Sequence, residues 1–251
     1  MDIAHGLRTP TTGSTRATGW PLLLRGLTWG TVLATVAGLY LALVYAGTDT
    51  TQGDVQRIFY IHMPAFFGAF VGFAAGVVGG VAYLRTRNPK WDTLAVAGIE
   101  VGFTLALINL VTGMIWARPI WNTWWTWDPR LTASAVMTLT YAAYFMLRNG
   151  IENVETRRRF ASVYGALAIV TVVITIAVIR IRPDTIHPAV IGPNPQNAQG
   201  SFAGSSTMGV TLGVNMLVWG LLVPLTLIWH RIRLHDFADH AAALKSAFLE
   251  K

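Results

Sequence analysis

The chain has 251 residues, of which 53% are hydrophobic and 12% are charged, and its formal net charge is +7. Soluble domains carry about 25% charged residues, so this composition leaves too little polar surface to cover a water-soluble globule. It predicts an integral membrane protein and argues against soluble and disordered classes. The absence of cysteine excludes disulfides, zinc–thiolate sites, iron–sulfur clusters and a thiol nucleophile in this chain.

Six apolar stretches are long enough to cross a bilayer, which takes about 20 mostly apolar residues. In chain order they run over 27–46, 64–84, 94–117, 131–147, 160–179 and 208–229. The sequence therefore predicts an all-α, polytopic membrane protein that forms a single six-helix domain over residues 1–251. The first 25 residues lack the apolar region and cleavage site of a signal peptide, so we expect the first stretch to remain as a helix.

The basic residues predict the orientation of these spans. All 19 Lys and Arg lie outside the six stretches. With the N-terminus in the cytoplasm, 14 of them lie on the cytoplasmic side and 5 on the opposite side. This asymmetry follows the positive-inside rule and predicts that both termini are cytoplasmic. We interpret the net charge as a topology signal rather than as a nucleic-acid-binding surface.

The outer loop over 118–130 and the residues just before it are rich in tryptophan. Half of the ten tryptophans lie here: Trp116, Trp121, Trp124, Trp125 and Trp127. An aromatic belt at the membrane interface accounts for one or two at a helix end, but not for five in twelve residues.

Two prolines frame a predicted helix in this loop. Pro119 suits the first position of a helix, and Pro129 cannot continue one. Between them Trp121, Trp124 and Trp125 share one helical face. We therefore predict a short amphipathic helix that lies flat on the outer leaflet and forms an aromatic platform for a large, flat, apolar ligand.

Asp128 and Arg130 follow the tryptophans at the entrance of the fourth span. Asp128 directly before Pro129 is typical of a helix N-cap with proline at the first position, and we favour capping over direct ligand contact. Arg130 has two open alternatives, an ion pair with Asp128 or a contact with a ligand carboxylate.

The predicted topology places two histidines on the outer side. His62 lies in QRIFYIHMP before the second span, and His187 lies in RIRPDTIHPAV, in the outer loop 180–207. A lone histidine at an interface is more often a hydrogen-bonding residue than a ligand. Two neutral imidazoles, however, can hold haem iron from opposite faces. Arg57, Arg180 and Arg182 are candidates to meet the two haem propionates.

Three polar residues lie inside the predicted spans. We interpret Glu100, Asn109 and Asn215 as groups that form hydrogen bonds to neighbouring helices. The C-terminal stretch 231–251 is predicted to be either a solvated cytoplasmic tail or a docking surface for a partner.

The string WNTWWTWDPRLT over 121–132 resembles the tryptophan-rich WWD motif of the haem exporter protein C (CcmC) family of cytochrome c maturation. GMIWARP just upstream, QRIFYIHMPA over 56–65 and the six-span layout over about 20–235 are similar to the same family. Two features depart from it. Asn122 stands where family members usually have glycine, and the region before His187 lacks the tryptophan pair expected there.

The resemblance implies that the chain holds haem b at the outer leaflet of the bacterial inner membrane. It implies His62 and His187 as axial ligands of the iron. The same resemblance places six residues around the haem: Trp121, Trp124, Trp125, Trp127, Asp128 and Arg130. It also implies partners, namely an ABC-type ATPase (CcmA), a membrane subunit (CcmB), a small single-span subunit (CcmD) and a periplasmic haem chaperone (CcmE) that receives the haem.

Three functions can be weighed from the sequence. We expect a haem-handling subunit that is not itself an enzyme, with ATP hydrolysed by a partner, because no nucleophile–base pair or P-loop is present. The alternative is a cytochrome c haem lyase of the same WWD superfamily, against which the length of 251 residues and the Arg-Leu-Thr ending of the motif both argue. A solute permease would need a polar site near the midplane of the bilayer, which the nearly uncharged spans do not provide.

Overall fold

A computed structural model describes residues 21–182, 184–188 and 204–249 of the chain. Within these residues every regular element is a helix, and the β-type pairing is limited to an isolated bridge between Asp49 and Gly53. The predicted cytoplasmic tail up to residue 20 and residues 189–203 of the third outer loop lie outside the described residues.

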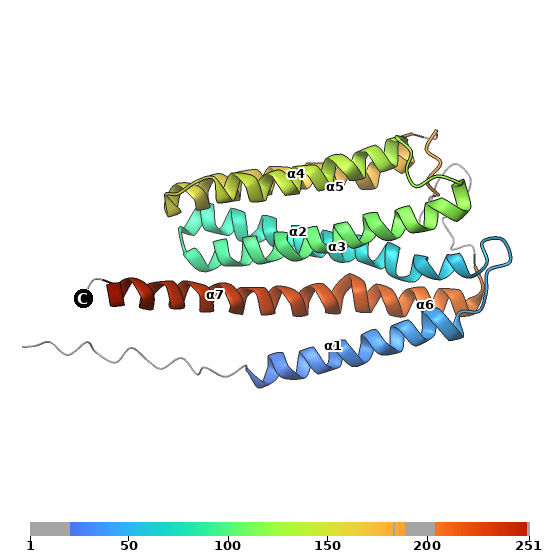
Figure 1. The fold of residues 1–251 in the computed structure, drawn as a ribbon, viewed down its shortest axis with the longest axis horizontal. Coiled ribbons are helices and arrows are strands. Elements are labelled where there is room, and N and C mark those ends of the chain that lie inside the picture. The colour runs from blue at the N-terminus through green and yellow to red at the C-terminus, as the bar shows by residue number, and fades with distance from the viewer. Residues whose placement is uncertain (1–20, 183, 189–203, 250–251) are drawn as a thin grey trace, which may run out of the picture.

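The helices run side by side along one common axis (Figure 1). In chain order they are α1 (Leu22–Tyr40) with a π-helical turn at Leu41–Tyr45, a 3-10 helix at Asp54–Ile58, α2 (Phe59–Thr86), α3 (Pro89–Trp121), α4 (Pro129–Asn149) and α5 (Val154–Ile181), followed by α6 (Ser206–Leu217), a π-helical turn at Val218–Leu222 and α7 (Val223–Leu249). The last three join without a break into one helical segment of 44 residues.

Short polar residues start several of these helices. The side chain of Asn88 accepts a hydrogen bond from the Lys90 backbone N–H ahead of α3, and Pro89 takes the first helical position. Asn153 caps α5 and Ser205 caps α6 in the same manner. Such side chains satisfy backbone donors that the first turn of a helix leaves free. The starts of α3, α5 and α6 are therefore specified by a capping residue in the sequence.

Five helical segments are long and apolar enough to cross a membrane: Leu22–Tyr45, Asp54–Thr86, Pro89–Trp121, Val154–Ile181 and Ser206–Leu249. They confirm the prediction of an all-α, polytopic membrane protein. The remaining helix, α4, has 21 residues, but its threonines, serine and tyrosines lower its hydropathy below that of the other five. The sixth span and the cytoplasmic placement of both termini stay predictions.

Glycines allow α2 and α3 to pack closely. A Cβ atom added to Gly72 would lie 2.5 Å from the backbone nitrogen of Gly102, and one added to Gly79 would lie 2.6 Å from that of Ala95. Small residues at such positions let the backbones of membrane helices approach each other. The α2–α3 pair is the most extensive helix contact in the described structure.

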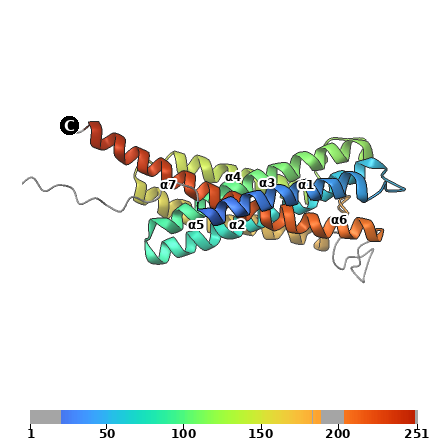
Figure 2. The same ribbon diagram turned by 90° about the horizontal axis from the view of Figure 1, so that it is seen from below.

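The three polar residues predicted to join helices do so. The Nδ2 of Asn215 on α6 donates to the carbonyl of Gly38 on α1 at 3.1 Å. Glu100 on α3 accepts hydrogen bonds from Arg231 at 2.8 Å and His235 at 2.9 Å, both on α7. Asn109 joins α3 to α2, as described below. The segment after residue 230 is helical, because α7 continues through it to Leu249 and projects past the other helices (Figure 2). Its roles as a solvated tail or a docking surface stay predictions.

The described parts of the three predicted outer loops lie at one end of the bundle (Figure 1). The indole Nε1 of Trp116 on α3 donates to Oε1 of Gln52, in the α1–α2 connection, at 2.9 Å. Asp128, in the α3–α4 connection, accepts from the backbone N–H of Ile186 at 3.0 Å. Segments that are far apart in the sequence therefore build one site at this end.

Candidate functional site

A cavity of about 580 Å³ lies at this end, between α2, α3, α4 and α5. Its volume falls within the range of about 300–1,000 Å³ that is usual for cofactor and small-molecule sites. Most of its lining is aromatic or aliphatic, and six of its large side chains are Phe59, Met63, Phe66, Trp116, Trp121 and Trp125. Both predicted histidine ligands and two arginines also line it. The cavity suits a largely apolar ligand that carries some charge.

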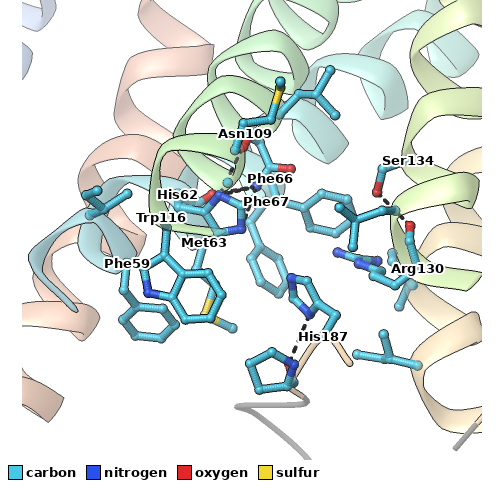
Figure 3. Close-up of a pocket in the computed structure, with 18 of the residues that line it drawn as sticks. Phe59, His62, Met63, Phe66, Phe67, Asn109, Trp116, Arg130, Ser134 and His187 are labelled. Atoms are coloured by element: carbon cyan, nitrogen blue, oxygen red, sulfur yellow. Dashed lines mark hydrogen bonds between the residues drawn. The ribbon is translucent and has the colours of Figure 1, made fainter. Parts of the chain in front are cut away.

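His62 projects into the cavity from the first turn of α2 (Figure 3). Its Nδ1 lies 2.9 Å from the backbone carbonyl oxygen of Asn109 and 3.2 Å from Oγ1 of Thr112, both on α3. A carbonyl oxygen can only accept a hydrogen bond, so Nδ1 carries the proton. In the neutral ring the lone pair then sits on Nε2, the nitrogen that can bind a metal ion.

Two residues of α3 fix the position of this ring. A Cβ atom added to Gly113 would lie 2.9 Å from Cε1 of His62, so only glycine leaves room for the imidazole. Asn109 donates from Nδ2 to the backbone carbonyl of His62 at 2.8 Å. Its Nδ2 also lies 3.3 and 3.4 Å from the two ring nitrogens, nearly equidistant from them and therefore not aligned with the Nε2 lone pair.

His187 reaches the same cavity from the segment after α5 (Figure 3). Its Nδ1 lies 3.1 Å from the carbonyl oxygen of Pro188, so in this ring too Nδ1 is the donor and Nε2 keeps the lone pair. The centroids of the His62 and His187 rings are 6.3 Å apart and their planes are inclined by 33°. The structure thus brings the two predicted ligands together, each with the same nitrogen held by a backbone carbonyl.

The His187 imidazole is neutral at physiological pH. Its pKa is lowered to about 3, mainly by burial and in addition by the positive charge of Arg130 and by the neighbouring His62 ring. A neutral imidazole is the form that binds a metal ion, since the protonated ring has no free lone pair. The cavity therefore holds His187 in its binding form well below neutral pH.

The predicted tryptophan helix between Pro119 and Pro129 is wrong over 122–128. Instead α3 continues through Pro119 to Trp121, and the chain is not helical again until α4 begins at Pro129. Asn122 ends α3 because it adopts a left-handed backbone with φ of 55°. Glycine and asparagine tolerate this conformation best, which accounts for asparagine at a position where glycine is usual. The helical spacing of the tryptophans did not reveal this break.

Only part of the tryptophan cluster lines the cavity. Trp121 and Trp125 do, and the Trp121 ring lies 6.5 Å from that of His187 in an edge-on arrangement. Trp124 and Trp127 are 54% and 75% exposed and are not among the lining residues, so their predicted contact with haem stays a prediction. Trp116, which was not predicted as a site residue, lines the cavity and packs edge-on against Trp121 at 5.0 Å.

Trp125 leaves a polar atom without a partner. Among the residues that the structure describes, its indole Nε1 is buried and makes no hydrogen bond. Buried polar groups are normally hydrogen-bonded, so such an atom beside a cavity indicates a missing acceptor. A carboxylate of a bound ligand is an acceptor of the required kind.

Asp128 caps α4 as predicted and does not line the cavity. Its side chain accepts from the backbone N–H of Leu131 at 2.8 Å, with Pro129 at the first helical position. Arg130 does line the cavity: its guanidinium lies 4.7 Å from the centroid of the Phe66 ring and donates to the backbone carbonyl of Thr175. The hydrogen bonds of Arg130 and Asp128 thus go to different partners.

Of the three arginines that the sequence suggested as propionate partners, one lines the cavity and two do not. Arg180 lines the cavity together with Arg130, and both are placed to meet a ligand carboxylate. Arg57 pairs with Asp54 at 3.1 Å and Arg182 pairs with Asp184 at 2.6 Å, and neither lines the cavity. The prediction that Arg57 and Arg182 meet propionates therefore finds no support in the geometry, whereas Arg130 and Arg180 fit that role.

Comparison with known proteins gives one family. A family model described as "Heme exporter protein C" matches residues 11–189. A protein of that name from Rhodobacter capsulatus is 33% identical over 148 residues, which cover 59% of this chain and 60% of the relative. One from Bradyrhizobium diazoefficiens is 28% identical over 237 residues, 92% of this chain and 81% of the relative. One from Escherichia coli K12 is 31% identical over 159 residues, 62% and 61% respectively.

Proposed function

The chain belongs to the heme exporter protein C family, and from this premise we propose that it binds haem b as cargo and delivers it during cytochrome c maturation. The observation that carries the proposal is the pair of imidazoles in one apolar cavity, each with Nδ1 on a backbone carbonyl and Nε2 left to bind iron. The matched segment spans about 60% of the length of the Rhodobacter capsulatus and Escherichia coli K12 relatives.

The spacing of the two rings fits a metal ion between them. Bonds from a transition metal to imidazole nitrogen are about 2 Å long, so two such bonds on opposite sides put the ring centroids roughly 6 Å apart. The observed separation is 6.3 Å. Haem iron accepts two axial ligands of this kind. His62 and His187 would supply them, and the carbonyls of Asn109 and Pro188 would orient the rings.

The rest of the cavity fits the porphyrin. Trp116, Trp121 and Trp125 offer a large aromatic surface to a flat macrocycle. Arg130 and Arg180 would pair with the two propionates. The Nε1 of Trp125 would donate to a propionate as well, which would satisfy a buried donor that has no acceptor among the described residues.

The proposed setting is the bacterial inner membrane, with the haem site on the periplasmic side. The support is the excess of basic residues in the segments that the sequence predicts to be cytoplasmic. In this setting the chain delivers haem to a periplasmic chaperone of the CcmE type. It works with a CcmA-type ATPase, a CcmB-type membrane subunit and a CcmD-type single-span subunit. The chain itself handles haem and is not an enzyme, so ATP is hydrolysed by the partner.

The haem site is tested by absorption spectra of the detergent-purified, haem-loaded protein. We expect the sharp bands of six-coordinate low-spin haem in the wild type. His62→Ala and His187→Ala each remove one axial ligand and should abolish that signature. His240→Ala on the exposed end of α7 is the matched control and should leave the spectrum unchanged. A folded wild-type protein that takes up no haem would overturn the proposal.

Delivery is tested separately by mixing the haem-loaded protein with the purified chaperone and with an apocytochrome c. We expect covalent haem on the chaperone and none on the apocytochrome, measured by haem staining after denaturing electrophoresis. Covalent haem on the cysteines of the apocytochrome would instead favour the haem-lyase alternative.

A further inference from the structure

We propose that Asp128 is a positioning residue for His187: it fastens the segment after α5 to the start of α4 and thereby sets where the second imidazole lies. The inference rests on the proposed haem site, but it concerns a residue that does not line the cavity. It gives the aspartate of the tryptophan motif a role that neither capping nor haem contact describes.

The two carboxylate oxygens of Asp128 serve different elements. Oδ1 accepts from the backbone N–H of Leu131 and caps α4 at 2.8 Å. Oδ2 accepts from the hydroxyl of Thr185 and from the backbone N–H of Ile186, the latter at 3.0 Å. One side chain therefore joins the first turn of α4 to a segment 57 residues further along the chain.

The contact continues from Thr185 to His187. The Thr185 hydroxyl donates to Asp128 and accepts from the backbone N–H of His187 at 3.2 Å. The backbone nitrogens of Ile186 and His187 are thus both fixed, one directly and one through a hydroxyl. Residues 184–188 contain no helix or strand, so side-chain hydrogen bonds of this kind determine their backbone conformation.

The chemistry requires a carboxylate. Three donors converge on Asp128, and an ionised carboxylate accepts at both oxygens and donates at neither. Asparagine keeps one acceptor oxygen and is as good an N-cap as aspartate, so Asp128→Asn retains the cap of α4. Its amide NH₂ would then face the N–H of Ile186, which can only donate. This substitution separates the positioning role from the capping role.

The test uses the full-length, haem-loaded protein and four variants. In Asp128→Asn and Thr185→Val we expect haem to remain bound through His62, while the low-spin signature gives way to the five-coordinate spectrum of His187→Ala. Loss of outer-shell partners typically weakens metal ligation by about 10–100-fold, and we expect the affinity of the sixth ligand to fall by a factor in that range for Asp128→Asn. Thr185→Ser keeps the hydroxyl and should restore the wild-type spectrum. Thermal unfolding should be nearly unchanged in Asp128→Asn because the cap is retained.

Two results would overturn the inference. One is a wild-type low-spin spectrum in Asp128→Asn. The other is complete loss of haem from Asp128→Asn under conditions in which His187→Ala retains it, since that would make Asp128 a haem contact or a purely structural residue.

A measurement without haem separates this inference from the proposed function. The rate at which diethyl pyrocarbonate modifies His187, followed by mass spectrometry on the haem-free protein, should rise in Asp128→Asn and Thr185→Val and stay at the wild-type value in Thr185→Ser. If wild type took up no haem, the proposed function would fail, and an unchanged modification rate would then overturn the positioning role as well.

Discussion

The two histidines that face the cavity are held in opposite ways. His62 belongs to a helix, and the neighbouring helix supplies its hydrogen-bond acceptor, its polar partner Asn109 and the space left by Gly113. His187 belongs to an irregular segment, and its position depends on hydrogen bonds made by Asp128 and Thr185. Packed helices in a bundle resist deformation, whereas a loop held by a few hydrogen bonds opens at a lower free-energy cost. We therefore expect His62 to be the rigid ligand and His187 to be the releasable one.

This difference suits the function proposed above, in which the chain both binds haem and releases it. A ligand that stays in place would keep the haem bound while the second coordination position is exchanged for a group on the acceptor. If both histidines were fixed by helix packing, release would require the bundle to deform.

Gly113→Ala tests the tight packing that holds the His62 ring in place. The added methyl group would lie 2.9 Å from Cε1 of His62, so the imidazole must move. We expect haem affinity to fall by about 10–100-fold, as for other changes that misplace a metal ligand. The affinity is measured by haem titration of the purified protein. Gly213→Ala on α6 is the control, because a Cβ atom there meets nothing within 4 Å, and it should bind like the wild type. Equal affinities for the two variants would contradict the tight fit of His62.

Low pH should destabilise the docked position of His187. Burial holds the pKa of His187 at about 3, whereas a released histidine has an ordinary pKa of about 6.5. Its docked position is therefore fully stable above pH 6.5 and loses stability as the pH falls from 6.5 toward 3, by roughly tenfold per pH unit in the docking equilibrium. The low-spin fraction should fall along this acid limb, measured by absorption against the His187→Ala variant. A loss of ligation on raising the pH above 7 would contradict this sign.

Trp121→Ala and Trp127→Ala compare a tryptophan that lines the cavity with one that does not. Trp121 lines the cavity beside His187, whereas Trp127 is 75% exposed and lies outside it. An aromatic contact contributes about 0.5–1.5 kcal/mol, so we expect Trp121→Ala to weaken haem binding by about two- to thirteenfold. Trp127→Ala should change the affinity little. A larger effect for Trp127→Ala would indicate that the exposed tryptophans contact the haem after all.

The smallest effect concerns the end of α3. Asn122→Gly and Asn122→Ala both remove the side-chain contact with Arg118, but only alanine is strained at a φ of 55°. Alanine should cost about 1 kcal/mol more than glycine, equivalent to about 2–4 °C in the melting temperature of a chain of this size. Differential scanning fluorimetry of the two variants measures the difference. Identical melting temperatures would mean that the backbone relaxes at this residue.

Local features of the site could be predicted from the sequence. Asp128 before Pro129 predicts a capped helix start, because a carboxylate accepts hydrogen bonds from the first turn of a helix. In the structure Asp128 caps α4. The length of the apolar stretches predicted five of the helical segments that are long enough to cross a membrane. The predicted topology put His62 and His187 on the same side of the membrane. These inferences needed only neighbouring residues or the order of spans along the chain.

Other features depend on contacts that no local pattern encodes. The helical spacing of Trp121, Trp124 and Trp125 predicted a helix, but one left-handed residue, Asn122, ends α3 before that spacing applies. Gly113 was indistinguishable from the other glycines of the spans, because its importance lies in a histidine 51 residues away on another helix. The link from Asp128 to Thr185 joins segments that are close only in the folded protein. The sequence signal of a left-handed turn at residue 122 was that asparagine stands where family members usually have glycine.

The helical segment Ser206–Leu249 has a consequence for distance across the membrane. Its 44 residues rise by about 1.5 Å each, which gives a length of roughly 66 Å. A bilayer measures about 40–45 Å across with its headgroups. A continuous helix of this length that crosses the bilayer along its normal, starting at one headgroup surface, would extend about 20 Å beyond the lipid on the other side. A partner that binds the far end of α7 would therefore contact the chain at a fixed height above the membrane surface.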